Sequence, residues 1–224
     1  QWGADHIATA HNLDDQAETI LMRVLRGTGP TGLQGIEHAS ADGRIVRPLL
    51  AVSRAEILEF ARTQGVSWRE DVSNEGDAYT RNRLRHHWLP ALRDEFNPQL
   101  LRTIARLADV MQEEEAWIRV TVAKVAERMT AKGPQLTGSE LVWVEKGWNQ
   151  LPDGLALRVI RQGLHDLGRG RNVTRVHLKR VLDFLRRPDV ETGRSMQLPG
   201  GDCVTRTATG YRVALGPRDE APAC

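Results

Sequence analysis

The first 68 residues alternate between short apolar runs and stretches with the periodicity of an amphipathic helix. We expect short buried strands over residues 6–10, 44–50 and 66–68, with two helices between them that end at Gly27 and Gly65. We expect Asn12 to cap the first helix, with Asp15 at the third helical position, and a capping box of Ser53 and Glu56 to open the second. Strand–helix alternation of this kind produces a parallel sheet with crossover helices, so the sequence predicts an α/β fold. Three strands would make a thin sheet, and we therefore expect the C-terminal part of a larger, Rossmann-like parallel sheet.

A mainly helical region with a small β element follows the α/β region. We expect helices over residues 98–129, 152–167 and 174–186, and strands over residues 195–198, 203–207 and 211–215. This change of pattern predicts three parts, with an α/β domain over 1–96, a helical domain over 97–216 and a tail over 217–224.

Composition excludes several classes of protein. The only cysteines are Cys203 and Cys224, too few for a disulfide framework or a cysteine-rich zinc or iron–sulfur site. This usage is typical of a reducing compartment, and we expect a cytoplasmic location. No apolar run approaches 18 residues, so we expect no membrane-spanning segment.

Positive charge gathers in one late segment. The whole chain carries a net charge of only +2, but residues 155–187 hold nine basic against two acidic side chains, a net of +7. Such a segment favours an anionic partner, above all nucleic acid, although a solvated helix face could have the same composition. The residues expected to contact nucleic acid are Arg158, Arg161, Arg175 and Lys179.

A cluster of polar residues lies where the first strand meets the first helix. His11, Asp14, Asp15 and Glu18 fall within eight residues, at the end of a sheet where ligands bind in open α/β folds. Clustered carboxylates repel one another unless a cation is shared, and their oxygens suit Mg²⁺. The alternative is that they only interact favourably with the helix dipole.

A second cluster is basic. Arg81 and Arg85 stand four residues apart, so on a helix they share one face, where an anion between them would relieve their repulsion. The alternative is an ordinary exposed basic helix.

These motifs together resemble the tRNA(Ile)-lysidine synthetase family of N-type ATP pyrophosphatases. The longest match runs from Thr9 to Thr19 and on through Arg26-Gly27-Thr28-Gly29. Three later matches follow in the same order, Arg47 to Leu50, Trp68 to Asp71 with Ser73 and Asn74, and Arg81 to Arg85. The helical part resembles the tRNA-binding domain of the family more loosely.

The resemblance implies an adenine nucleotide α-hydrolase-like fold and a two-step ligation. ATP adenylates C2 of the wobble cytidine in a tRNA(Ile) with a CAU anticodon, and free L-lysine then displaces AMP to give lysidine. It implies ATP and Mg²⁺ as cofactors, and it leaves room for a homodimer.

The resemblance also implies roles for individual residues. Asp15 would hold Mg²⁺ or the reacting lysine amine, with Asp14 beside it on the metal. Glu18 would orient lysine or the metal, and His11 and Asp14 would line the nucleotide site. Arg81 and Arg85 would stabilise charge on phosphate during adenylyl transfer.

One departure from the family pattern leaves alternatives open. The family binds ATP phosphates with a Ser-Gly-Gly-x-Asp-Ser loop, and these 224 residues contain no such sequence. We therefore expect a chain truncated at its N-terminus and inactive by itself. The rivals are a tRNA cytidine thiolase, which needs more cysteines, and a non-catalytic RNA-binding fragment.

Overall fold

The computed structural model describes residues 3–68, 80–131, 141–170 and 172–216. The chain forms two compact units, Gln1–Trp117 and Ile118–Cys224, with the division inside one long helix. The domain boundary expected after residue 96 stays a prediction. Within the described residues, no helix is both long and apolar enough to cross a membrane.

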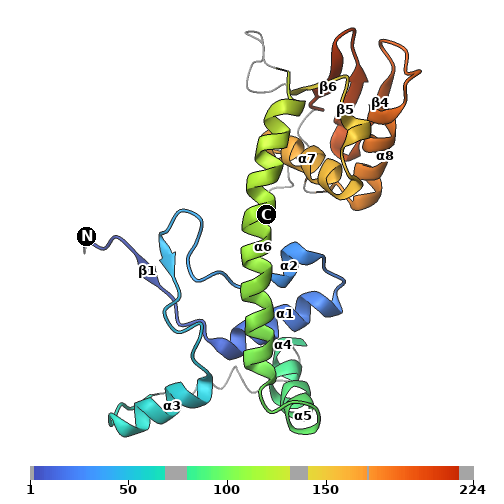
Figure 1. Ribbon diagram of the computed structural model, residues 1–224. Helices are drawn as coiled ribbons and strands as arrows, with labels where there is room; N and C mark the ends of the chain where they lie inside the picture. The colour runs from blue at the N-terminus through green and yellow to red at the C-terminus, as the bar shows by residue number, and fades with distance from the viewer. Residues whose placement is uncertain (1–2, 69–79, 132–140, 171, 217–224) are drawn as a thin grey trace. The chain divides into compact units, whose positions relative to one another are not determined.

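The first unit combines a two-stranded sheet with helices (Figure 1). Its elements are β1 (Ile7–Ala8), α1 (Leu13–Leu25), α2 (Pro30–Leu33), β2 (Ile45–Val46), α3 (Arg54–Thr63), α4 (Thr80–Arg83), a π-helical turn (Leu84–Trp88), α5 (Leu89–Glu95) and α6 (Leu100–Met129), of which α6 continues into the second unit. The two strands are parallel, with Ile7 opposite Ile45, which confirms the expected α/β class with a parallel sheet.

Two expectations about the strands are wrong. The first strand is short and exposed, since Ile7 keeps 64% of its surface accessible. Residues 66–68 form no strand. The amide of Val66 donates to Ala61 O and closes the C-terminus of α3, while Gly65 adopts a left-handed φ of 67°. In this Schellman-type ending, the Val66 amide is bonded to the helix and is not available for pairing with a neighbouring strand.

The expected helix starts are confirmed. Asn12 and Asp15 exchange reciprocal hydrogen bonds of 3.0 Å between side chain and backbone at the start of α1. Ser53 and Glu56 make the same capping box at α3. Each pair satisfies two amides that the first turn of a helix leaves without a partner.

A small core holds α1 against α5 and α6. Ala17 and Ile20 of α1 pack with Leu89, Ile104 and Ala108, all at most 8% exposed. The π-helical turn precedes α5, because Pro90 lacks an amide proton and its ring would clash with the carbonyl four residues earlier. The amide of Leu89 donates instead to Leu84 O, five residues back.

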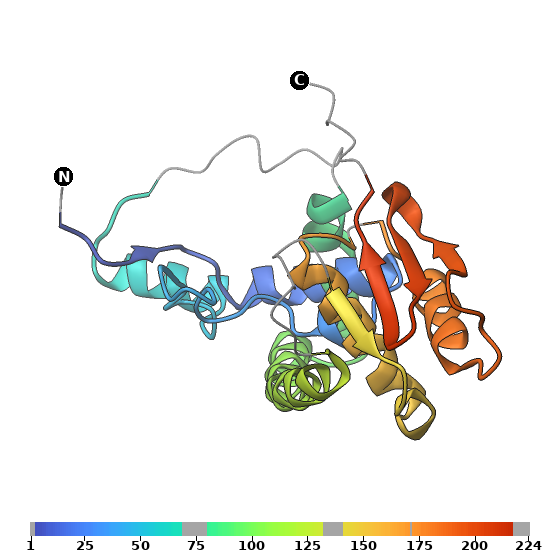
Figure 2. The ribbon, with the colours of Figure 1, turned by 90° about the horizontal axis from the view of Figure 1, so that it is seen from above.

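The second unit is an antiparallel sheet with helices on one face (Figure 2). Its elements after α6 are β3 (Leu141–Val144), a 3-10 turn (Trp148–Gln150), α7 (Asp153–Asp166), α8 (Arg175–Arg186), β4 (Ser195–Gln197), a second 3-10 turn (Pro199–Gly201), β5 (Cys203–Arg206) and β6 (Gly210–Ala214). The strand order is β3-β6-β5-β4. The helices and strands expected after residue 152 are confirmed, but β3 was not expected.

Close packing between α7 and β3 explains a helical glycine. A Cβ atom on Gly163 would lie 2.6 Å from Leu141 Cδ2 and 3.1 Å from the indole of Trp143. Trp143 and Trp148 are almost completely buried and meet edge to face, with ring centroids 5.7 Å apart. Gly163 therefore lets α7 approach the sheet.

Candidate functional site

The acidic residues expected from the sequence occupy the first two turns of α1, directly after β1. The capping box fixes this start, so Asp14 and Asp15 leave the helix in its first turn and Glu18 in the next. His11 lies in the preceding loop, where its Nδ1 is 2.9 Å from Thr9 Oγ1. The site thus begins at the carboxyl end of a parallel strand, where open α/β sheets bind their ligands.

The two carboxylates of Asp15 and Glu18 meet the two guanidinium groups expected from the sequence. Arg81 donates from Nε to Glu18 Oε2 at 2.7 Å and from Nη2 to Asp15 Oδ1 at 2.8 Å. Arg85 donates from Nε to Glu18 Oε1 at 2.6 Å, and from Nη2 to Asp15 Oδ1 at 3.1 Å and Glu18 Oε2 at 3.0 Å. We call these four residues the charge cluster.

Burial makes Glu18 the anchor of the charge cluster. Its side chain is fully buried, whereas the side chains of Arg81 and Arg85 are 42% and 22% exposed. A buried carboxylate needs its charge compensated, and two guanidinium groups do this here. The hydrogen bond to Glu18 raises the pKa of Arg85 above its usual value. Glu18 therefore sets the positions of both arginines.

The ion pairs of the charge cluster account for both charged groups that the sequence led us to expect at this site. The sequence predicted a cation between the carboxylates and an anion between the arginines, and in the structure each pair is the counter-ion of the other. Asp15 uses Oδ1 for both arginines and Oδ2 for the Asn12 amide. A divalent cation beside these oxygens would meet two guanidinium charges, so Asp15 in this arrangement does not fit Mg²⁺.

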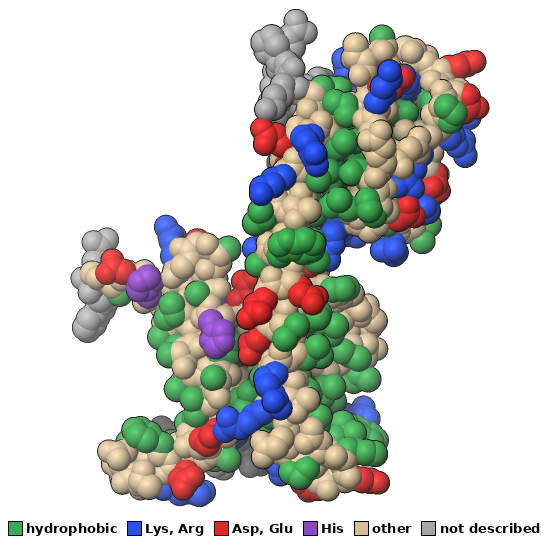
Figure 3. Space-filling view, in the orientation of Figure 1, with side chains coloured by type: hydrophobic (Ala, Val, Ile, Leu, Met, Phe, Trp, Pro, Cys, Tyr) green, Lys and Arg blue, Asp and Glu red, His purple; other side chains and the backbone are tan. Residues whose placement is uncertain are grey.

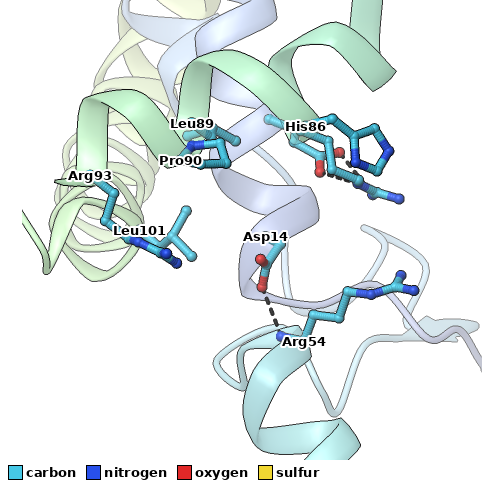
Figure 4. A pocket seen from close by; sticks show the side chains of 9 residues that line it. Asp14, Arg54, His86, Leu89, Pro90, Arg93 and Leu101 are labelled. Carbon is cyan, nitrogen blue, oxygen red and sulfur yellow. Dashed lines mark hydrogen bonds and ion pairs between the residues drawn. The ribbon is translucent and has the colours of Figure 1, made fainter. Parts of the chain in front are cut away.

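Asp14 takes a different direction. Its Oδ2 accepts a 2.8 Å hydrogen bond from the backbone amide of Arg54, at the first residue of α3 (Figure 4). A carboxylate at that position compensates the positive end of the α3 dipole. Asp14 therefore ties the starts of the two helices together. Within the described residues, no group of three or more His, Cys, Asp or Glu side chains is placed to hold a metal.

A pocket of about 270 Å³ opens between Asp14 and the charge cluster. Its polar lining includes Asp14, Glu18, Arg54, Arg85 and Arg93. The other side chains that line it are His86, Leu89, Pro90 and Leu101, which come from the π-helical turn, α5 and α6 (Figure 4). The lining thus combines charged side chains with the apolar ones of Leu89, Pro90 and Leu101, and Arg93 lies on the apolar side, next to Leu101 (Figure 4).

Three polar residues of this pocket were not expected from the sequence. Arg54 and Arg93 are exposed arginines on helix surfaces, and His86 follows Arg85 in the π-helical turn. In the sequence these three residues look like other surface residues. They stand out only because the folded chain brings them to one pocket. His11, expected in the nucleotide site, is not among the residues that line this pocket. The motif residues 69–74 lie outside the described part of the chain.

The four basic residues that the sequence assigned to nucleic-acid binding differ in their ion pairs and in their exposure. Lys179 pairs with Asp153 at 2.9 Å and Asp183 at 3.4 Å. Arg161 and Arg175 are exposed, and Arg158 is half-buried. On the face shown in Figure 3, Lys and Arg side chains of this unit are scattered among acidic ones and do not form one patch.

Two other basic residues of the same segment, Arg186 and Arg169, bond to groups of the protein itself. Arg186 donates to Trp148 O, Leu151 O and Asp153. Arg169 donates to Gly216 O and pairs with Asp202. Arg171 lies outside the described residues. The +7 segment thus contributes fewer uncompensated charges than its composition indicates.

Comparison with known proteins identifies a domain and several relatives to which this chain is similar. The profile of the PP-loop domain matches residues 1–92. A tRNA(Ile)-lysidine synthase from Solibacter usitatus is 40% identical over 202 residues, which cover 88% of this chain and 44% of the relative. The enzyme of the same name from Geobacter sulfurreducens is 35% identical over 210 residues, 92% of this chain and 42% of the relative.

A third relative matches a shorter stretch more closely. The tRNA(Ile)-lysidine synthase from Geobacillus kaustophilus is 44% identical over 131 residues, 58% of this chain and 28% of the relative. The chain spans less than half the length of these relatives. Residues 1–92 thus match a PP-loop domain, and over most of its residues the chain is similar to tRNA(Ile)-lysidine synthases.

Proposed function

We propose that the complete protein containing these residues joins free L-lysine to C2 of the wobble cytidine in a tRNA(Ile) with a CAU anticodon. In the first step, the cytidine O2 attacks the α-phosphorus of ATP, and pyrophosphate leaves. In the second step, the ε-amine of lysine attacks C2, loses a proton, and AMP leaves with the former O2. The product is lysidine.

The charge cluster is the observation that carries this proposal. It joins two motif segments up to 70 residues apart at the carboxyl end of a parallel strand. The side chain of Arg81 is 42% exposed and uses Nε and Nη2 on the carboxylates, which leaves the donors of Nη1 outside these ion pairs. Donors already aligned by a buried carboxylate suit the charge that develops on phosphate during adenylyl transfer.

The cluster residues have distinct proposed roles. Arg81 and Arg85 contact the phosphate of the adenylyl group, and Glu18 is a positioning residue that acts through them. Asp15 accepts hydrogen bonds from Nη2 of both arginines and accepts the ε-amine of lysine when an arginine moves away. Mg²⁺ would supply charge neutralisation for the leaving pyrophosphate, but no step here depends on it.

The pocket beside Asp14 is the proposed site for lysine. Asp14 offers a carboxylate to the α-ammonium group of lysine, and Arg54 or Arg93 offers a guanidinium to its α-carboxylate. The apolar side, formed by Leu89, Pro90 and Leu101, suits the methylene stem of lysine.

Analysis of nucleosides from treated tRNA tests the proposal. The complete protein is incubated with ATP, Mg²⁺, isotopically labelled lysine and tRNA(Ile) with a CAU anticodon, and the digest is separated by liquid chromatography with mass detection. We expect labelled lysidine, and none when ATP is omitted or when the anticodon lacks the wobble cytidine. A thiolated wobble cytidine in the product would contradict the proposal. So would an unmodified wobble cytidine, provided that an active lysidine synthase modifies the same tRNA in a parallel reaction.

A further inference from the structure

The pocket beside the charge cluster contains one group whose role the proposed function leaves open. His86 lines this pocket together with Arg85, the residue before it in the π-helical turn (Figure 4). Free lysine arrives with its ε-nitrogen as an ammonium group, because the ordinary pKa of a lysine side chain is about 10.4. An ammonium nitrogen has no lone pair, so one proton must leave before this nitrogen can attack C2.

The other charged groups around the pocket are poorly suited to accept that proton. They are Asp14 and Glu18 of α1, Arg54 of α3, Arg85 of the π-helical turn and Arg93 of α5, with Arg81 of α4 paired to Glu18. Guanidinium groups keep their protons in proteins and have no acceptor. Asp14 already accepts the Arg54 amide, and both oxygens of Glu18 accept hydrogen bonds from guanidinium groups. Histidine is the side chain whose ordinary pKa lies near neutrality, and among the described lining residues His86 is the one histidine.

The arrangement of the lining gives a bound lysine a direction that ends at His86. In the view of Figure 4, Arg93 and Leu101 lie on one side of Asp14, and His86 lies on the other. With its α-carboxylate on Arg93, lysine would extend its methylene stem past Asp14 toward the imidazole. The charge cluster, where the adenylyl phosphate is proposed to bind, borders the same pocket. The ε-nitrogen would therefore lie near both the proton acceptor and the carbon that it attacks.

We propose that the imidazole of His86 is the general base for lysine transfer. It takes one proton from the ε-ammonium group, and the lone pair freed on nitrogen forms the new bond to C2. The bond between C2 and O2 breaks, its electrons leave with AMP, and the second proton passes from the attached nitrogen to the phosphate of AMP. The side chain of His86 is exposed, so the imidazolium can return its proton to solvent before the next turnover. The inference rests on the proposed function, since it names the acceptor for a proton of that reaction.

Measuring the two steps of the reaction separately tests this role. The complete protein is first incubated with ATP, Mg²⁺ and tRNA(Ile) without lysine, and release of pyrophosphate reports adenylation. Labelled lysine is then added by rapid mixing, and its incorporation is followed over a single turnover. We expect His86→Gln to slow incorporation by about 100-fold or more, the usual contribution of a general base, while pyrophosphate release keeps the wild-type rate.

The dependence of the rate on pH separates a base from a structural contact. Without the imidazole, the ε-nitrogen must lose its proton to solvent, so the rate of incorporation in His86→Gln should rise by about tenfold per pH unit from about pH 7.5 to about pH 9.5. The wild-type rate should change little over this range. Added imidazole should restore part of the rate in the variant. The control His38→Gln, at an exposed position of the same unit outside the pocket lining, should behave as the wild type.

Three results would overturn the inference while leaving the proposed function in place. One is a wild-type rate of incorporation in His86→Gln. Another is an equal loss of pyrophosphate release and of incorporation in both His86→Gln and His86→Asn, which would show that the side chain supports the fold. The third is a slow variant whose rate does not rise with pH, which would show that His86 holds a substrate and takes no proton. Absence of lysidine with the wild-type protein would instead contradict the proposed function, and the inference with it.

Discussion

Replacing Glu18 by glutamine tests the physical basis of the charge cluster. The side chain is fully buried and accepts three hydrogen bonds from Arg81 and Arg85. Glutamine keeps the shape but removes one negative charge, so two guanidinium groups are left with Asp15 alone. Removing one partner of a buried ion pair costs about 3–5 kcal/mol.

Solvent reduces this cost. Because the arginine side chains are 42% and 22% exposed, water and ions screen part of the uncompensated charge. We therefore expect Glu18→Gln to reduce the free energy of unfolding of the first unit by about 2–3 kcal/mol. Added salt should recover part of the loss, since screening weakens the repulsion between the arginines.

Amide hydrogen exchange of α1 is the appropriate assay because the chain has two compact units and exchange reports on the first by itself. Faster exchange over Leu13–Leu25 would report local loss of stability in the variant. Asp109→Asn, at an exposed position of α6, is the matched control and should change stability by less than about 0.5 kcal/mol. Equal exchange rates in Glu18→Gln and the wild type would refute the reasoning.

Three further predictions concern the second unit. Hydrogen bonds from Lys179 and then Arg186 lower the pKa of Asp153. These contacts stabilise the unit above the unfolded pKa of about 3.9, and the contribution is lost as pH falls through the lower folded value. NMR titration should show the pKa of Asp153 rise in Lys179→Gln while the contact with Arg186 still holds it below the ordinary value. Gly163→Ala should cost about 1–3 kcal/mol in urea unfolding, because the new methyl group has no room against the sheet, and an unchanged midpoint would contradict the close approach. Asp202→Asn should destabilise by about 2–4 kcal/mol, since Asp202 is 2% exposed and pairs with Arg169; a thermal midpoint equal to wild type would show the pair to be dispensable.

Features encoded by neighbouring residues were predicted well from the sequence. The capping boxes at Asn12 and Ser53 involve residues three positions apart, so the pattern itself specifies the contact. The predicted strand at residues 66–68 failed because two local signals competed. Gly65 ends α3 with a motif in which the Val66 amide donates to Ala61 O. The apolar side chains of residues 66–68 do not show that this amide is already bonded.

Long-range pairings were only partly predictable. The sequence indicated that Asp15 and Glu18 need a cation and that Arg81 and Arg85 need an anion, but spacing cannot show that the two needs meet across more than 60 residues. The net charge of +7 counted over residues 155–187 overstates the free positive charge for a related reason. Asp153 lies two residues before the +7 segment and pairs with Lys179 and Arg186 inside it.

The rate of lysine transfer in variants of the charge cluster tests the central claim most directly. In the complete protein, single-turnover incorporation of labelled lysine into tRNA(Ile) is compared for wild type, Arg81→Gln, Asp15→Asn and the control Asp109→Asn. We expect both cluster variants to lose at least about 100-fold in rate, as for removal of a main electrostatic contact, while the control keeps the wild-type rate. Wild-type rates in both cluster variants would show that the cluster stabilises the fold and takes no part in the reaction.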